Sequence, residues 1–134
     1  SKSIFRDFAH SPSKLRASLS AVKNQFSNKQ IISLYELHTF SSFHTEFIKE
    51  YSGCMDSADI KVVYYDSEVL QKRSKTIISQ ELIHNSFNNN EIIVLNNKKD
   101  LSHFIKDINS DNYVLLLMSS GSFSSLDFLS LINR

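Results

Sequence analysis

The segment SIFRDFAHSPSKLRASLSAVKNQF, residues 3–26, predicts a strand, a turn and a helix in that order. Residues 4–8 are mostly apolar or aromatic, as short strands are. Ser11 is a suitable N-cap, and Pro12 then falls at the first helical position, where its missing N–H costs no hydrogen bond. One apolar stripe with helical spacing follows, made of Leu15, Leu19, Val22 and Phe26. This strand–turn–helix unit is typical of an alternating α/β fold.

The same alternation continues along the chain. Further strands are expected at residues 30–35, 60–65, 91–95 and 113–118. Helical stripes are formed by Phe43, Phe47, Ile48 and Tyr51, ending at the C-cap candidate Gly53, and by Leu101, Phe104, Ile105 and Ile108. Residues 79–87 and 124–132 are additional helix candidates, and residues 67–77 and the Asn run ending at Asn90 are expected surface loops.

The predicted strands are mostly apolar on both faces, which suits a sheet that helices cover on both sides. We therefore expect a three-layer α/β fold with a mostly parallel sheet of five or six strands and right-handed crossovers. A length of 134 residues fits a single domain, residues 1–134, without repeats or an internal linker.

Charge and cysteine usage restrict the class of partner. Fifteen Lys and Arg residues against fourteen Asp and Glu residues give a net charge of +1, which argues against nucleic acid as a partner. No apolar run approaches the roughly 20 residues that a membrane helix needs. The lone Cys54 cannot form an internal disulfide, which fits a cytoplasmic protein. The chain lacks an initiator methionine and begins with a strand, so we expect it to be a fragment of a longer protein.

Several familiar motifs are absent. The two glycines, Gly53 and Gly121, can form neither a GxxxxGK[ST] phosphate loop nor a GxGxxG dinucleotide turn. The five histidines, His10, His38, His44, His84 and His103, show no HExxH spacing, and a single cysteine allows no CxxC pair. We therefore predict no metal site in this chain and read Cys54 as a small buried thiol.

Polar residues gather where the predicted strands end. In an open α/β sheet, ligands bind beyond the carboxyl ends of the strands. The residues at or just beyond such ends are Asp7, His10, Glu36, His38, Asp66 and Ser119, Ser120 and Gly121. Their clustering predicts a site there. Each also has an ordinary structural explanation, since Asp7 can stabilise a turn, Ser11 can cap a helix and serines can bond nearby backbone.

Three ordered segments resemble one enzyme family. RDFAHSPSKLRASLSAVK, residues 6–23, is similar to the (D)(Y/F)AHxP segment that opens the C-terminal domain of the Mur ligases. Residues 34–66, LYELHTFSSFHTEFIKEYSGCMDSADIKVVYYD, resemble the next strand, helix and strand in the UDP-N-acetylmuramate branch, which includes the L-alanine-adding enzyme and the murein-tripeptide recycling ligase. YVLLLMSSGSFSSLD, residues 113–127, resembles the last strand and its glycine turn. The resemblance implies a Rossmann-like α/β domain.

The resemblance also implies a function. These ligases use ATP and Mg²⁺, bound mainly by a central domain, to activate a carboxylate as an acyl phosphate, which the incoming amine attacks. Asp7, His10 and Ser11 would then face ATP, and His38, Thr39, Ser41 and Ser42 would face the acceptor. Ser119, Ser120 and Gly121 form a further candidate turn at the site. The resemblance implies as partners the central and N-terminal domains, UDP-N-acetylmuramate, and L-alanine or murein tripeptide. It implies no catalytic residue in this chain.

The chain departs from the family at two places. HTFSSF, residues 38–43, stands where the alanine-adding branch has a stretch like HRYSRT, so Thr39 and Ser42 occupy its two arginine positions. Since an arginine binds a small carboxylate in bidentate fashion, this difference favours a peptide acceptor over free L-alanine. The serines around Gly121 replace a more glycine-rich turn.

Two other classes of function remain open from the residues alone. Asp66 follows a central strand, as the phosphorylated aspartate of a phosphoacceptor signalling domain does, although MSSGS, residues 118–122, lacks the lysine expected after the last strand. A noncatalytic α/β interaction module is the third alternative.

Overall fold

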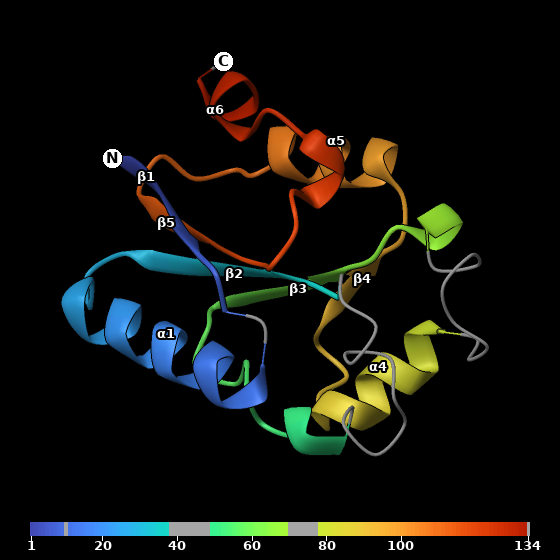
Figure 1. The fold of residues 1–134 in the computed structure, drawn as a ribbon. Coiled ribbons are helices and arrows are strands. Elements are labelled where there is room, and N and C mark those ends of the chain that lie inside the picture. The colour runs from blue at the N-terminus through green and yellow to red at the C-terminus, as the bar shows by residue number, and fades with distance from the viewer. Residues whose placement is uncertain (10, 38–48, 70–77, 134) are drawn as a thin grey trace.

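The computed structural model describes residues 1–9, 11–37, 49–69 and 78–133, and they form one sheet with helices on both faces (Figure 1). The strands are β1 (Lys2–Asp7), β2 (Gln30–Glu36), β3 (Ile60–Tyr64), β4 (Ile93–Leu95) and β5 (Tyr113–Met118). Their order is β1-β5-β2-β3-β4, and every neighbouring pair is parallel. The predicted fold class is therefore confirmed.

Helices cover the two faces unequally. One face carries α1 (Pro12–Gln25), the short 3₁₀ turn η2 (Lys49–Tyr51) and α4 (Gln80–Phe87), whereas α5 (Lys98–Lys106) and α6 (Phe128–Ile132) cover the other (Figure 1). A second 3₁₀ turn, η3 (Phe123–Ser125), links β5 to α6. Successive strand residues point to opposite faces, so the core forms two layers. In β2, for example, Ile31 and Tyr35 join the α1 layer, and Ile32 and Leu34 join the α5 layer.

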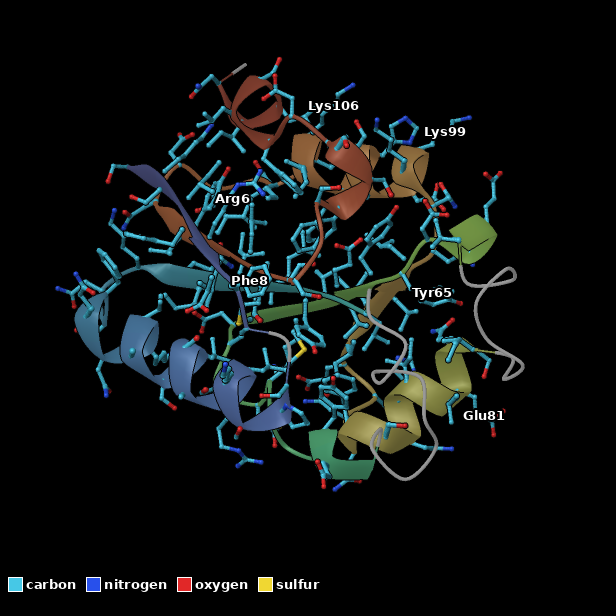
Figure 2. The ribbon with its side chains drawn as sticks, in the orientation of Figure 1. Arg6, Phe8, Tyr65, Glu81, Lys99 and Lys106 are labelled. Atoms are coloured by element: carbon cyan, nitrogen blue, oxygen red, sulfur yellow. The ribbon has the colours of Figure 1, made fainter. Side chains whose placement is uncertain are left out.

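Helix α1 begins as the sequence predicts. Ser11 has an extended backbone (φ −137°), its Oγ accepts a hydrogen bond from the Lys14 amide, and Pro12 is the first helical residue. Leu15 and Leu19 are fully buried against the sheet. Apolar side chains fill the space between the layers, while Lys99 and Lys106 project from α5 away from the sheet (Figure 2). The helix is held mainly by the packing of this buried stripe against the sheet.

Three predicted features are wrong in detail. β1 is not buried on both faces: Phe5, Arg6 and Asp7 are exposed, because β1 is an edge strand with β5 as its neighbour. The continuous helix predicted at 124–132 is broken, because Ser124 has a left-handed backbone (φ 57°) and α6 starts later. Ile108 packs beside the core but lies beyond the end of α5.

Some predictions fall on residues that the structure does not describe. Most of the helix expected from Phe43 to Tyr51 and most of the loop at 67–77 lie outside the described residues. Gly53, the expected C-cap, does have the left-handed backbone (φ 74°) that such a cap requires. In the part of the chain that is described, no helix has the length and apolarity that a membrane span requires.

Candidate functional site

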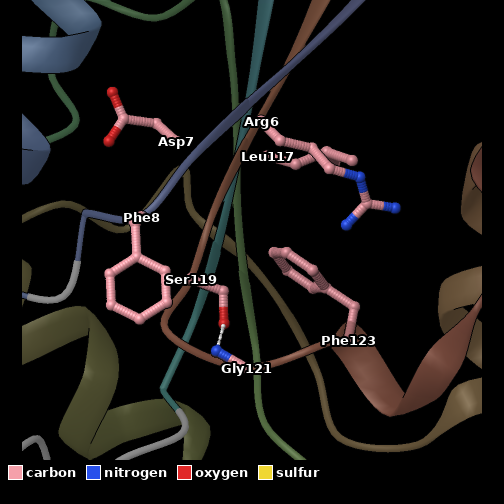
Figure 3. Close-up of a pocket in the computed structure, with 7 residues that line it drawn as sticks. All are labelled: Arg6, Asp7, Phe8, Leu117, Ser119, Gly121 and Phe123. Atoms are coloured by element: carbon pink, nitrogen blue, oxygen red, sulfur yellow. Dashed lines mark hydrogen bonds between the residues drawn. The ribbon is translucent and has the colours of Figure 1, made fainter.

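The carboxyl ends of β1 and β5 lie side by side, and the chain leaves them in opposite directions. Beyond β1 it passes to α1 on one face, and beyond β5 it passes through η3 to α6 on the other (Figure 1). Such a divergence leaves a crevice at the strand ends, where α/β proteins bind ligands. A hollow of about 280 Å³ occupies this position, lined by Arg6, Asp7, Phe8, Leu117, Ser119, Gly121 and Phe123 (Figure 3).

The pleat of β1 sorts its side chains to the two sides of the sheet. Arg6 pairs in register with Leu117 of the α5 layer, and Asp7 pairs with Met118 of the α1 layer. The Arg6 guanidinium and the Asp7 carboxylate therefore lie on opposite sides of the strand (Figure 3). Phe8 follows at the rim with its side chain 70% exposed.

The turn after β5 forms the floor of the hollow, and Glu36 at the end of β2 holds it. Glu36 is 4% exposed, and its Oε1 accepts hydrogen bonds from Ser119 Oγ at 2.6 Å and from the Phe123 amide at 3.0 Å. Ser119 Oγ in turn accepts a hydrogen bond from the Gly121 amide at 2.7 Å (Figure 3). One buried carboxylate thus fixes both ends of the turn.

This turn has an unusual backbone. Phe123, Ser124 and Ser125 all have positive φ angles, of 52°, 57° and 61°, which costs non-glycine residues conformational energy. Ser124 is held from β3, because its Oγ lies 2.7 Å from Tyr64 Oη and donates to Asp66 Oδ2 at 3.0 Å. Burial raises the pKa of Tyr64, and the Ser124 hydrogen bond partly offsets this effect.

Both carboxylate oxygens of Asp66 accept hydrogen bonds from neighbouring residues. Its Oδ1 accepts hydrogen bonds from the Glu68 and Val69 amides, and its Oδ2 accepts the bond from Ser124. A phosphoacceptor aspartate instead needs an accessible oxygen beside a bound metal ion. Among the described residues, no group of three or more His, Cys, Asp or Glu side chains could hold a metal ion. The phosphoacceptor alternative therefore gains no support from the geometry.

The residues predicted to face ATP do not share one hollow. Asp7 lines the hollow described above, and its Oδ2 accepts a 2.6 Å hydrogen bond from Ser18 in α1. Ser11 lines a separate hollow of about 440 Å³ at the start of α1, together with Pro12, Ser13, Arg16, Glu50 and Cys54. His10 lies outside the described residues. Their role toward ATP stays a prediction.

The predicted acceptor residues His38, Thr39, Ser41 and Ser42 also lie outside the described residues. β2 ends at Glu36, so the segment that carries them starts at the same edge of the sheet as the hollow. Ser119 and Gly121 line the hollow, and Ser120 between them is half-buried.

Cys54 is a buried thiol, as the sequence predicts. It is 2% exposed, and its Sγ lies 3.7 Å from Arg16 Nη2 and 3.5 Å from the Pro12 carbonyl oxygen. Burial raises the pKa of the thiol, although Arg16 beside it acts in the opposite direction. A nucleophilic cysteine instead needs a lowered thiol pKa, because the thiolate is the reactive form.

Sequence reasoning missed several residues of the hollow, namely Arg6, Phe8, Leu117 and Phe123. Arg6 and Phe8 could have been found from the strand period, because residues two apart point to the same side. Phe123 could not, since its position depends on the left-handed turn.

A parallel five-stranded sheet with a hollow at the β1–β5 divergence defines an α/β domain of the Rossmann-like kind. Comparison with known proteins confirms the resemblance to the C-terminal domain of the Mur ligases, in their UDP-N-acetylmuramate branch. No family model matches the chain.

The relatives are longer than this chain. A UDP-N-acetylmuramate–L-alanine ligase from Sulfurihydrogenibium sp. is 25% identical over 125 residues, which cover 92% of this chain and 27% of that protein. Among solved structures, a murein peptide ligase from Psychrobacter arcticus has a TM-score of 0.75 at 18% identity, covering 98% of this chain and 27% of that one. A UDP-N-acetylmuramate–alanine ligase from Thermotoga maritima has a TM-score of 0.57 at 24% identity, covering 98% of this chain and 25% of that one. The chain thus spans about a quarter of the length of each of these three ligases.

Proposed function

We propose that this chain is the C-terminal domain of an ATP-dependent ligase that joins L-alanine or a murein tripeptide to UDP-N-acetylmuramate in the cytoplasm. The observation that carries the proposal is the similarity over 92% of the chain to a quarter of an L-alanine-adding ligase. The hollow at the strand ends supports it, because that is where an α/β domain meets its ligands.

In the proposed reaction, the γ-phosphoryl group of ATP passes to the muramate carboxylate, giving ADP and an acyl phosphate. The amine of the acceptor then attacks the acyl carbon, forms the amide bond and displaces phosphate. Mg²⁺, held by the missing domains, would neutralise the phosphate charge during the first step. This chain would bind and orient the substrates, which lowers the entropic part of the barrier.

Asp7 is proposed to contact the ribose of ATP. Its carboxylate is exposed, and the bond from Ser18 occupies Oδ2, which leaves Oδ1 for a ribose hydroxyl. His10 and Ser11 would meet the nucleotide at the start of α1, where the Ser11 cap bond to the Lys14 amide is long, at 3.5 Å. A weak cap bond leaves the first-turn amides available to a phosphate or base edge.

His38, Thr39, Ser41 and Ser42 are proposed to face the acceptor beyond β2. The hydroxyl groups of Thr39 and Ser42 can each donate one hydrogen bond to an acceptor carboxylate, whereas an arginine would bind it with two parallel hydrogen bonds and a positive charge. We therefore favour the murein tripeptide, which brings further polar groups to bind, over free L-alanine.

The test is turnover by the full-length protein with ATP, Mg²⁺ and UDP-N-acetylmuramate, with L-alanine and murein tripeptide compared side by side. Phosphate release and the mass of the product report the reaction. We expect acceptor-dependent phosphate release and a higher kcat/KM with the tripeptide. A preference for L-alanine would overturn the acceptor assignment, and no turnover with either would overturn the proposed function.

The isolated 134-residue chain serves as the control in the same assay. It should melt cooperatively but release no phosphate, because its two glycines cannot form a phosphate loop and its hollow is one wall of a site between domains. Turnover by the fragment would contradict the domain assignment.

A further inference from the structure

Arg6 is exposed and lines the hollow. No hydrogen bond or ion pair joins Arg6 to any other residue that the structure describes. The guanidinium instead faces an aromatic ring: Arg6 Cζ lies 5.6 Å from the centroid of Phe128. Cation–π contact leaves the N–H groups at the edge of the guanidinium free to bind an anion in its plane.

Two neighbouring elements hold Arg6 in place. The parallel pairing of β1 with β5 fixes its backbone opposite Leu117, and a hydrogen bond from the Ser119 amide to the Asp7 carbonyl, at 3.1 Å, extends that ladder past the end of β1. The Phe128 ring, at the start of α6, then contacts the guanidinium and favours this orientation. A guanidinium that is already placed loses less entropy when it binds a ligand.

The described carboxylates near the hollow make hydrogen bonds to other groups and no ion pair with Arg6. Asp7 points to the other side of β1 (Figure 3) and accepts a hydrogen bond from Ser18. Glu36 is buried, and its Oε1 accepts hydrogen bonds from the turn after β5. Asp127, the residue before Phe128, caps α6 by accepting from the Ser130 amide at 3.2 Å. Among the described residues, none of these carboxylates lies within ion-pair distance of Arg6, so they do not compete with an anionic ligand for its guanidinium.

We propose that Arg6 binds a carboxylate group of the incoming amino acid or peptide, in the part of the hollow between β1, Phe123 and α6. This assignment rests on the proposed ligase function, which supplies acceptors that carry a carboxylate. Arg6 lies on the side of β1 away from α1 and Asp7, where the nucleotide is proposed to bind. The planar fork of an arginine matches a carboxylate in bidentate fashion, which a lysine cannot reproduce.

The first test measures anion binding without turnover. In the full-length protein, the Arg6 side-chain Nε–Hε signal is followed by NMR during separate titrations with acetate and with inorganic phosphate, and Arg6→Gln assigns the signal. We expect a saturable shift with acetate. The absence of a saturable acetate shift, or saturation by phosphate alone, would overturn the carboxylate assignment.

The second test measures where Arg6 acts in the proposed reaction. Arg6→Gln should raise the KM for the acceptor by about tenfold or more, with the KM for ATP unchanged and Arg6→Lys intermediate. Lys106→Gln removes the same charge from the last turn of α5, at a residue that does not line the hollow, and should change neither constant. An unchanged acceptor KM in Arg6→Gln, or a rise in the KM for ATP alone, would overturn the proposal. If no acceptor supports turnover, the proposed function fails while the acetate titration still decides the anion site.

Discussion

Glu36→Ala is the substitution that tests how the turn after β5 is held. Glu36 is 4% exposed, and its Oε1 accepts from both Ser119 Oγ and the Phe123 amide. The alanine variant removes this acceptor from two largely buried donors, the Ser119 hydroxyl and the Phe123 amide. Glu36→Gln is the matched control, because its amide oxygen can occupy the place of Oε1 and accept the same two hydrogen bonds.

The magnitude follows from those contacts. Hydrogen bonds to a charged group contribute about 1.5–3 kcal/mol each, and losing one side of a buried polar pair costs more than its net value. We therefore expect Glu36→Ala to lower the free energy of unfolding by about 3–5 kcal/mol. Glu36→Gln keeps the geometry but loses the charge, so we expect a decrease of about 1 kcal/mol.

Urea unfolding of both variants, followed by far-UV circular dichroism, measures these values. Amide NMR shifts of Gly121 and Phe123 report whether the turn keeps its conformation. The three successive left-handed residues at 123–125 oppose the folded turn by roughly 1 kcal/mol each, so the turn should rearrange in Glu36→Ala. Equal losses in the two variants, or a loss below about 1 kcal/mol in Glu36→Ala, would refute this reasoning.

Three further predictions concern other parts of the molecule. In the full-length protein, Asp7→Ala and His10→Ala should each weaken the use of ATP by about 1.5–3 kcal/mol, measured as kcat/KM for ATP, and unchanged kinetics in both would remove the nucleotide assignment. Ser33→Ala should raise the free energy of unfolding by about 1 kcal/mol, because Ser33 Oγ is buried and has no hydrogen-bond partner among the described residues. A lower free energy of unfolding in this variant would mean that Ser33 Oγ does have a hydrogen-bond partner. Burial raises the pKa values of Cys54 and Tyr64 in the folded state. As the pH rises, the unfolded chain therefore loses these protons at a lower pH than the folded chain does, so the free energy of unfolding should fall above about pH 8.5. The fall is measured by melting temperature against pH, should be shallower in Cys54→Ala, and would be contradicted by constant stability between pH 8 and pH 10.5.

The start of α1 was predictable because its signals are local. An N-cap serine, a proline at the first helical position and an apolar stripe act within one turn or one helix face, and all three appear where expected. The strand segments were predictable for the same reason, since β-branched and apolar runs favour strands before any neighbour is known.

The burial of β1 was not predictable from its residues. Its apolar content favours an interior strand, but the insertion of β5 between β1 and β2 leaves β1 at the edge. Strand order depends on long-range pairing, which the residues of one strand do not encode. This placement also exposes Arg6 and Phe8 to the hollow.

The sequence by itself determined the α/β class, the positions of the strands and of α1, and the family resemblance, because these follow from local propensity, periodicity and short motifs. The tertiary structure alone decided which strand-end residues meet. It joins Glu36 at the end of β2 to the turn after β5, and it separates Ser11 from the hollow that Asp7 lines. The physical reason is that each of these pairings joins residues on different strands or elements. Their meeting depends on the strand order and on the left-handed turn at 123–125.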